Sequence, residues 1–325
     1  MHQYTHIHYI FNTIMQQYAE SYSVLIAISG GQDSICLIKL LNDFINKNNI
    51  KLKIEYIYID HQWRIDSKKN IKHLTNYLTI TKDRLSIYQA KLLTNSEMRA
   101  RYVRYQIIIE HAKKYHFTTI ITGHTKNDNI ETFLQKLIRG TTIDGATSLS
   151  IKREISNNLA LIRPLLMITR TELYWFTRKF FLPAWSDNTN YNYNVQRNRL
   201  RHELLPYIQK YYQMNLVHQM DGFLNNTRID NDYIKQNTIK LYLFIRHRSY
   251  IAINYKLFKQ QHQTIQQRII QLLLYHNFQK TLNFNLTLKI INILGKTHES
   301  TNNFYIQIPY QNLLVNIYYE WLYIS

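Results

Sequence analysis

A short run of small and polar residues early in the chain is suited to binding phosphate groups. Its members are Ser29, Gly30, Gly31, Gln32, Asp33 and Ser34. Successive glycines let backbone N–H groups approach a phosphate without obstruction from side chains, and the start of a helix adds a partial positive charge. The hydroxyls of Ser29 and Ser34 can donate hydrogen bonds, whereas the carboxylate of Asp33 implies a bridging cation such as Mg²⁺.

The stretches on both sides of this run favour a phosphate loop over an ordinary glycine turn. Residues 24–28 are continuously apolar, as in a buried strand, and apolar residues recur at helical spacing from 35 to 45. The run lacks the Gly-Lys-Ser/Thr ending of a Walker A loop, and it is not a dinucleotide-binding fingerprint. It therefore predicts a phosphate-binding loop of another class.

A second polar set follows the apolar stretch 118–122. His124 lies at the expected strand end, and Asp128 and Glu131 are three residues apart on a helix expected over 127–138. Because residues three apart share a helix face, both carboxylates can face one cleft. Two carboxylates there can hold a cationic substrate. The alternative for Asp128 is a structural role as a cap of the helix.

Two further motifs follow the same plan. Asp60 ends another expected strand, where it can contact a nucleotide or simply complete a turn. Glu97, Arg101 and Arg104 share one face of a helix expected over 96–115. Taken alone, that face is equally typical of a solvated stripe of ion pairs.

Basic residues dominate the chain as a whole. Lys and Arg total 40 against 21 for Asp and Glu, a formal net charge of +19, which favours a polyanionic partner. Nucleic acid is the first candidate and an acidic membrane surface the second. Arg197, Arg199 and Arg201 lie on a basic helix beginning near residue 196, where they can meet RNA phosphates or a leaving pyrophosphate. A generic basic surface helix is the alternative.

The elements that position these residues alternate between strand and helix. Strands are expected near 24–28, 54–59, 85–89 and 118–122, with helices near 34–45, 68–78, 96–115 and 127–138. This alternation predicts an α/β fold, a parallel sheet with helices on both faces, in which ligands bind beyond the carboxyl ends of the strands. We expect a catalytic domain over residues 1–212 and a smaller, mainly helical accessory domain over 213–325.

Composition excludes several classes of protein. One cysteine, Cys36, allows neither an internal disulfide nor a cysteine-rich zinc site. No apolar run reaches the ~20 residues of a membrane span, and the first residues read neither as a secretory signal nor as a transit peptide. Richness in Ile, Asn, Lys and Tyr is typical of an AT-rich genome. We therefore expect the protein in the stroma of a plastid (chloroplast), or otherwise in a bacterial cytoplasm.

In their order, these motifs resemble the lysidine synthases, a family of PP-loop ATP pyrophosphatases. The resemblance covers about residues 21 to 206 and rests on the following matches: the SGGxDS loop at 29–34; Asp60-His61 with Arg64 and Asp66-Ser67; Glu97, Ala100, Arg101, Arg104 and Tyr105; Gly123-His124 with Asp128, Glu131 and Arg139-Gly140; Arg163-Pro164-Leu165-Leu166; Asp187, Thr189 and Asn190; and Arg197-Asn198-Arg199 with Arg201. The chain departs from the family where Asn129 replaces the second of two adjacent acids, which leaves one negative charge fewer.

The resemblance implies a two-step reaction on tRNA. ATP adenylates the C2 oxygen of the wobble cytidine in an isoleucine tRNA with a CAU anticodon, and the ε-amine of L-lysine then displaces AMP. It implies ATP contacts for the SGGQDS loop and Asp60, a Mg²⁺ contact for Asp33, cytidine contacts for Arg101 and His124, and lysine contacts for Asp128 and Glu131. It further implies tRNA contacts for Arg197, Arg199, Arg201 and the C-terminal domain.

Two rival functions stay open at this point. One is another PP-loop tRNA-modifying enzyme, although a tRNA thiolase normally needs two cysteines or an iron–sulfur cluster and Cys36 is alone. The other is a non-catalytic RNA-binding protein, which the intact loop disfavours. A homodimer is an expectation that the sequence does not test.

Overall fold

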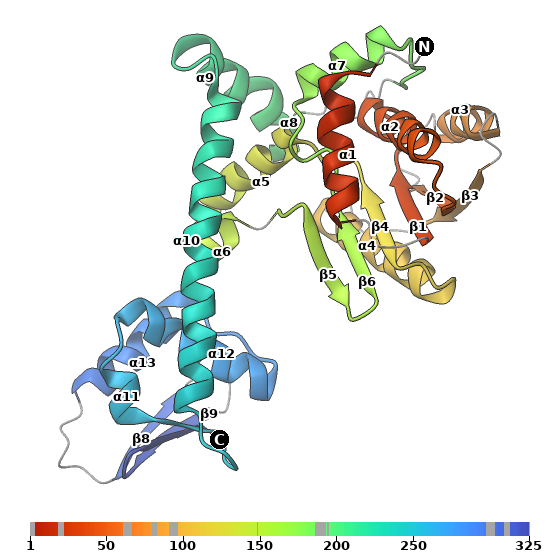
Figure 1. Cartoon of the computed structure of the whole chain (residues 1–325). Helices are drawn as coiled ribbons and strands as arrows, with labels where there is room; N and C mark the ends of the chain where they lie inside the picture. The colour runs from red at the N-terminus through yellow and green to blue at the C-terminus, as the bar shows by residue number, and fades with distance from the viewer. Residues whose placement is uncertain are drawn as a thin grey trace. The chain divides into compact units, whose positions relative to one another are not determined.

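The computed structural model describes most of the chain as two compact units (Figure 1). The described residues are 4–18, 23–60, 67–79, 83–90, 97–147, 149–185, 193, 195–296, 303–308 and 313–324. The first unit covers residues 1–225 and the second 226–325, so the division falls within the long helix α10 (Leu216–Ile245). The expected boundary after residue 212 lies just before this helix. The assignment of a catalytic and a tRNA-binding part to these segments stays a prediction.

The first unit is built on a six-stranded sheet. Its strands are β1 (Ser23–Ile28), β2 (Lys53–Asp60), β3 (Arg84–Gln89), β4 (Thr119–Thr122), β5 (Lys152–Ser156) and β6 (Leu159–Ile162). They are ordered β3-β2-β1-β4-β6-β5, and every neighbouring pair is parallel except β5 and β6. The predicted α/β fold is confirmed. The chain runs outward from β1 through β2 to β3 and then crosses to β4 on the other side of β1, so the loops after β1 and β4 lie side by side at the sheet's centre.

Helices cover both faces of this sheet (Figure 1). One face is covered by α1 (His6–Tyr18), α2 (Gln32–Asn48), α3 (Ser67–Thr79) and α7 (Arg170–Lys179), and the other by α4 (Glu97–Lys114). The remaining helices of the unit before α10 are α5 (Lys126–Arg139), α6 (Ile143–Ala146), α8 (Gln196–Arg199), the π-helical turn η2 (Leu200–Leu204) and α9 (Leu205–Tyr211), several of which pack together with the start of α10. Successive strand residues point to opposite faces: Ile26 packs in a core with α1, α2, α3 and α7, whereas Leu25 packs against α4. This alternation explains why the central strands are apolar throughout.

Local sequence sets where the functional helices begin. The spacing of Thr169 and Glu172 in the sequence predicts a capping box, and the two residues form it at the start of α7, each satisfying the other's backbone N–H. Thr125 and Asp128 form a second one at the start of α5. Asp128 therefore has the capping role considered from sequence, but only one of its carboxylate oxygens serves it.

The edge of the sheet differs in detail from the expectation. From sequence, residues 161–165 (LIRPL) predict a last strand that runs into a loop. In the structure β6 runs from Leu159 to Ile162, because Pro164 has no N–H with which to continue the ladder. Strand β5 was not predicted. It forms an antiparallel hairpin with β6 and carries three successive charged residues, Lys152, Arg153 and Glu154, and charged side chains are typical of an edge strand.

The second unit combines helices with a small antiparallel sheet. Besides the end of α10, it contains β7 (Ala252–Asn254), α11 (Tyr255–Lys259), α12 (Gln263–Phe278), α13 (Phe284–Lys296), β8 (Asn303–Ile308), β9 (Leu313–Tyr318) and β10 (Trp321–Ile324). Helical character is confirmed, and α12 includes the amphipathic helix expected over 264–274. The sheet, ordered β7-β10-β9-β8, was not anticipated. Among the described residues, no helix is long and apolar enough to cross a membrane.

One nearly buried ion pair ties α5 to the first part of α10. Lys126 Nζ lies 3.3 Å from Asp221 Oδ2, and each side chain is only 10% exposed. Lys126→Met leaves the Asp221 carboxylate without this partner, so we expect the free energy of unfolding to fall by about 3 kcal/mol in urea titrations.

Two further variants control this prediction. The double variant Lys126→Met/Asp221→Leu should recover most of the loss, since it leaves no unpaired charge. Lys152→Met breaks the exposed pair with Glu154 and should cost less than about 1 kcal/mol. Equal losses for both single variants would show that burial of the Lys126 pair has no energetic consequence.

Candidate active site

The loop between β1 and α2 adopts the geometry expected of a phosphate loop. Gly30 has φ +81°, a backbone conformation that favours glycine. Gly31 is the N-cap residue of α2, so no side chain covers the first backbone amides of this helix. The backbone N–H of Ser29 donates to Ser34 Oγ at 3.0 Å, and the two hydroxyl oxygens also lie 3.0 Å apart. Asp33 lies in the first turn of α2. Backbone amides and two hydroxyls therefore gather at one helix start.

Asn70 of α3 supports this loop from behind, and sequence reasoning missed it. The side chain is fully buried, and its Nδ2 donates to the Ser29 carbonyl at 3.0 Å. A Cβ added to Gly30 would lie only 2.2 Å from Asn70 Oδ1. That oxygen has no hydrogen-bond partner among the described residues. Position 30 therefore requires glycine for two reasons: the positive φ of the backbone, and the close approach of the Asn70 side chain.

The loop after β4 lies beside the phosphate loop. A Cβ on Gly123 would lie 3.4 Å from the backbone oxygen of Asp33, so the two loops approach closely. They enclose a cavity of about 150 Å³. Of the predicted site residues, this cavity is lined by Ser29, Asp33, Ser34 and His124, with Arg104 and Tyr105 of α4 opposite. The order of the motifs predicts that the polar loops at three strand ends, including Asp60-His61, converge on one cleft; the loops after β1 and β4 do lie together, whereas residues 61–66 lie outside the described residues.

His124 is held as a neutral imidazole. Its Nδ1 lies 2.9 Å from Thr122 Oγ1. Burial lowers the pKa of His124 to about 3; the charge of Asp128 opposes this effect, and that of Arg101 adds to it. At neutral pH the ring can donate or accept a hydrogen bond, but it is a weak base. Proton abstraction by His124, considered from sequence, is therefore poorly matched to this environment.

Three arginines from separate segments converge on Asp128 and Glu131. Arg170 of α7 places Nη2 2.6 Å from Asp128 Oδ1 and Nη1 2.6 Å from Glu131 Oε1. Arg197 of α8 reaches the same two acids at 2.7 and 2.8 Å. Arg201 of η2 donates to both oxygens of Glu131, at 2.8 and 2.9 Å. We call these five residues the arginine–carboxylate cluster.

The cluster keeps both carboxylates ionised. Burial alone would raise the pKa of Asp128, yet Arg170 and Arg197 hold it well below its usual range. The pKa of Glu131 is lowered as well, since Arg201, Arg170 and Arg197 outweigh its burial. The charges of these carboxylates are thus already compensated by arginine. A cationic substrate can bind them only by exchanging with one of the guanidinium groups.

Arg170 also connects the cluster to the phosphate loop. Its Nε lies 3.8 Å from Asp33 Oδ2, and its backbone N–H donates to Asn127 Oδ1 at 2.9 Å. Burial raises the pKa of Asp33 to about 6, and the positive charge of Arg170 opposes that rise. Sequence reasoning missed Arg170. The sequence nevertheless contains a sign of its role. A cation in the first turn of a helix is destabilised by the helix dipole, so acids are expected close to Arg170.

The remaining predicted residues are placed as follows. Asp60 is buried at the end of β2 and does not line the cavity. Gln32 is the first residue of α2. Arg101 lines a larger pocket beside α4. Arg199 is exposed and pairs with Glu203 at 2.9 Å, whereas Arg197 and Arg201 belong to the cluster. His61, Arg64, Asp66, Asp187, Thr189, Asn190 and the side chain of Glu97 lie outside the described residues. The roles assigned to all these residues stay predictions.

Asp33→Asn should stabilise the unliganded protein at neutral and alkaline pH. The pKa of the Asp33 carboxyl is 3.8 in the unfolded chain and about 6 in the folded protein. The protonated carboxyl therefore favours the folded state at low pH, and this contribution to the free energy of unfolding is lost as the pH rises through 6. With 28% of the side chain exposed, we expect a gain of about 2 kcal/mol at pH 8. Urea titrations should show this gain shrink as the pH approaches 4; a gain independent of pH would contradict it.

Gly30→Ala should abolish ATP binding, because the added methyl group meets Asn70 Oδ1 and the backbone resists φ +81°. Isothermal titration with ATP measures the loss. Gly222→Ala, in α10, is the control, since a Cβ there would meet nothing within 4 Å. Gly222→Ala should retain folding and ATP affinity, and equal affinities for the two variants would refute the role of Gly30.

Comparisons with known proteins agree with this geometry. Residues 3–208 match the PP-loop domain family. A chloroplastic tRNA(Ile)-lysidine synthase from Gracilaria tenuistipitata var. liui is 45% identical, with 99% of each chain covered. That of Pyropia yezoensis is 36% identical, with 93% of this chain and 90% of the relative covered.

Among solved structures, the U34-tRNA thiolase of Methanococcus maripaludis superimposes with a TM-score of 0.56 over 68% of this chain and 79% of its own. At 14% identity this likeness supports the fold alone. The two relatives cover nearly the whole chain, and the PP-loop match covers the loop and the cluster. The chain therefore belongs to the tRNA(Ile)-lysidine synthase family of PP-loop proteins.

Proposed function

We propose that this chain is a ligase that uses ATP to join L-lysine to C2 of the wobble cytidine in a CAU-anticodon tRNA(Ile). AMP and pyrophosphate are released. The observation that carries the proposal is the phosphate loop facing His124 across one cavity, with Asp128 and Glu131 joined to Asp33 through Arg170. The relatives that match almost the full length of the chain are named for this reaction.

ATP binds at the loop between β1 and α2. Backbone amides of Gly30 and Gly31 and the hydroxyls of Ser29 and Ser34 hold the phosphates, with Gln32 in the helix start and Asp60 toward the ribose or the metal. The Asp33 carboxylate fits Mg²⁺, since it lines the cavity and Mg²⁺ is commonly held by one or two carboxylates plus substrate phosphates. Bound there, Mg²⁺ supplies positive charge beside the leaving pyrophosphate.

The cytidine binds between Arg101 and His124. Its C2 oxygen attacks the α-phosphorus of ATP, the bond to the pyrophosphate breaks, and the cytidine is left adenylated at this oxygen. His124, neutral at working pH, holds the base by a hydrogen bond. Arg101 supplies positive charge, and its guanidinium lies 5.7 Å from the Tyr105 ring centroid. Adenylation converts a poor leaving group into a good one.

Lysine binds at Asp128 and Glu131. Their depressed pKa values suit them to hold an ammonium group as a charged partner. An ammonium group of lysine takes the place of one guanidinium, so that the buried carboxylates of Asp128 and Glu131 remain paired with positive charge during the exchange. The neutral ε-amine then attacks C2: the C2–N bond forms, the C2–O bond breaks, a proton is released and AMP departs with the oxygen.

The tRNA contacts and the location extend the proposal. Arg199, which is exposed, meets tRNA phosphates, and the unit of residues 226–325 binds the tRNA body. Arg197 and Arg201 act beside the modified base, where they reach RNA only if they leave their carboxylates. We place the enzyme in the plastid stroma, because the relatives are named chloroplastic and the composition is rich in Ile, Asn, Lys and Tyr. A homodimer is testable by light scattering.

Sulfur transfer is the rival reaction that the structure disfavours. Cys36 is the only cysteine, and its Sγ is buried 3.1 Å from Thr177 Oγ1. Burial raises the pKa of the Cys36 thiol to about 12, so it is a poor nucleophile. A non-catalytic RNA-binding protein would have no need for the buried, charged cluster beside an open phosphate loop.

Incubation with ATP, labelled lysine and purified tRNAs tests the function. Label should enter only the CAU-anticodon tRNA(Ile), and Asp33→Ala should remove tRNA-dependent AMP release. Asp128→Asn should raise the KM for lysine about tenfold, because one charged partner is lost, with little change in the KM for ATP. Glu110→Gln, an exposed acid on α4, is the control. Label in methionine tRNA, or unchanged AMP release from Asp33→Ala, would overturn the proposal.

A further inference from the structure

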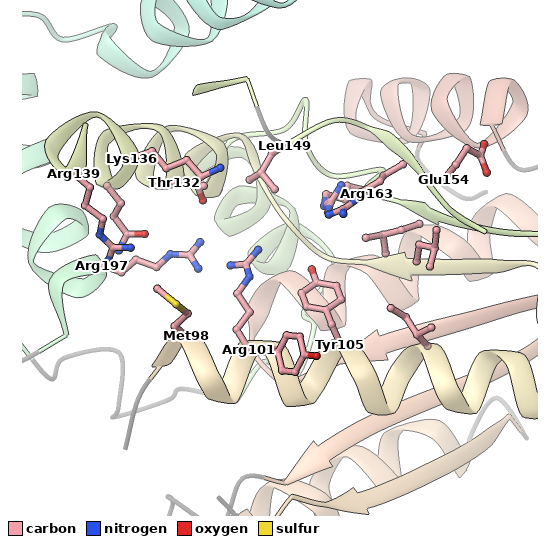
Figure 2. A pocket seen from close by; sticks show the side chains of 16 residues that line it. Met98, Arg101, Tyr105, Thr132, Lys136, Arg139, Leu149, Glu154, Arg163 and Arg197 are labelled. Atoms are coloured by element: carbon pink, nitrogen blue, oxygen red, sulfur yellow. The ribbon is translucent and has the colours of Figure 1, made fainter. Parts of the chain in front are cut away.

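A larger pocket, of about 810 Å³, lies beside the phosphate loop cavity (Figure 2). It is formed by α4, α5, β5, β6 and the start of α8, all within the first unit. Its cations are Arg101, Lys136, Arg139, Arg153, Arg163 and Arg197, and Glu154 is the acid among its lining residues. This volume is within the range of pockets that hold a ligand the size of a nucleotide.

Most of this positive charge is not compensated by acids among the described residues. Lys136 donates to the Gly145 carbonyl, and Arg139 donates to the Gln196 amide oxygen. Burial, together with the charge of Arg101, lowers the pKa of Lys136, as expected where cations crowd together. Of the cations in this pocket, Arg197 is the one that meets acids at short range within the described part of the chain, and those acids belong to the cluster. The pocket is therefore electrostatically suited to an anion.

Arg163 shows that a polar ligand is expected inside. Only 3% of this residue is exposed, and its Nη1 donates to the Ser150 carbonyl at 2.8 Å. Its Nε is buried with no hydrogen-bond partner among the described residues. A buried, unsatisfied charged donor is costly, so an acceptor arriving from the pocket gains from meeting it.

Aromatic faces give the pocket a second chemical character. Tyr102, 61% exposed, and Tyr105 both project from α4 into the lining, and Met98 lies one turn before Tyr102. Tyr105 also lines the phosphate loop cavity. Cations beside stackable rings are typical of sites for single-stranded nucleic acid. Because the two pockets share Tyr105, one strand can have consecutive nucleotides in both.

We propose that this pocket binds the nucleotide adjoining the wobble cytidine in the tRNA strand. Its phosphate lies on Lys136 and Arg139, and its base packs on Tyr102, next to the cytidine held at Arg101. The inference rests on the proposed function and extends it to a neighbouring nucleotide. ATP also carries phosphates that could bind these cations, but the loop proposed to hold them lines the smaller cavity.

Two variants test the site by different readouts. Arg139→Gln removes a phosphate contact: the KM for tRNA should rise about tenfold, and the slope of log affinity against log salt should shrink by about 1. Tyr102→Leu removes a stacking surface: the KM for tRNA should rise to a similar extent with the salt slope unchanged. Both side chains are exposed, so neither change should unfold the protein.

The controls separate the possible failures. Lys113→Gln removes an exposed cation at the far end of α4 and should leave every constant at its parental value. A rise in the KM for ATP with no change in the KM for tRNA would overturn the inference in favour of a nucleotide triphosphate. Parental values for tRNA in both variants would also overturn it. Absence of lysine incorporation by the parental enzyme would instead overturn the proposed function.

Discussion

The arrangement of the site depends on one buried carboxylate that needs three partners. Glu131 is completely buried, and guanidinium groups of Arg170, Arg197 and Arg201 donate to it. An ionised carboxylate in this position is tolerable only when it is paired and hydrogen-bonded. The segments that carry these arginines must therefore come to α5. The π-helical turn η2, where the Leu205 N–H reaches the Leu200 carbonyl, follows α8 directly, and its Arg201 meets Glu131 from a position four residues after Arg197.

The same constraint joins two functions that the fold would otherwise keep apart. Arg170 contacts Asp128 and Glu131 and lies 3.8 Å from Asp33, so it spans from the arginine–carboxylate cluster to the phosphate loop. A change of charge at either end alters the field at the other. Under the proposed function, the phosphates of ATP arrive beside Asp33 and compete with Asp128 and Glu131 for Arg170. In our account this weakens one arginine contact of the cluster when the amine of lysine must enter.

Much of this was predictable from the sequence because it depends on neighbouring residues. The phosphate loop, the parallel strands and the capping box of Thr169 all follow from spacing over a few positions. Arg170 and Asn70 were missed because their partners lie far away in the chain, at Asp128 and Ser29. The sheet of the second unit was missed for the same reason, since β7 pairs with β10 across nearly seventy residues. Contacts of this range leave little periodicity for a sequence pattern to show.

A crystal structure with L-lysine and a non-hydrolysable ATP analogue tests the central claim most directly. We predict the outer phosphates on the Gly30 and Gly31 amides and a lysine ammonium within hydrogen-bond distance of Asp128 or Glu131, in the place of one guanidinium. Phosphates bound away from these glycines would contradict the account. So would a lysine elsewhere in the protein while every arginine contact of the cluster stays as it is without ligands.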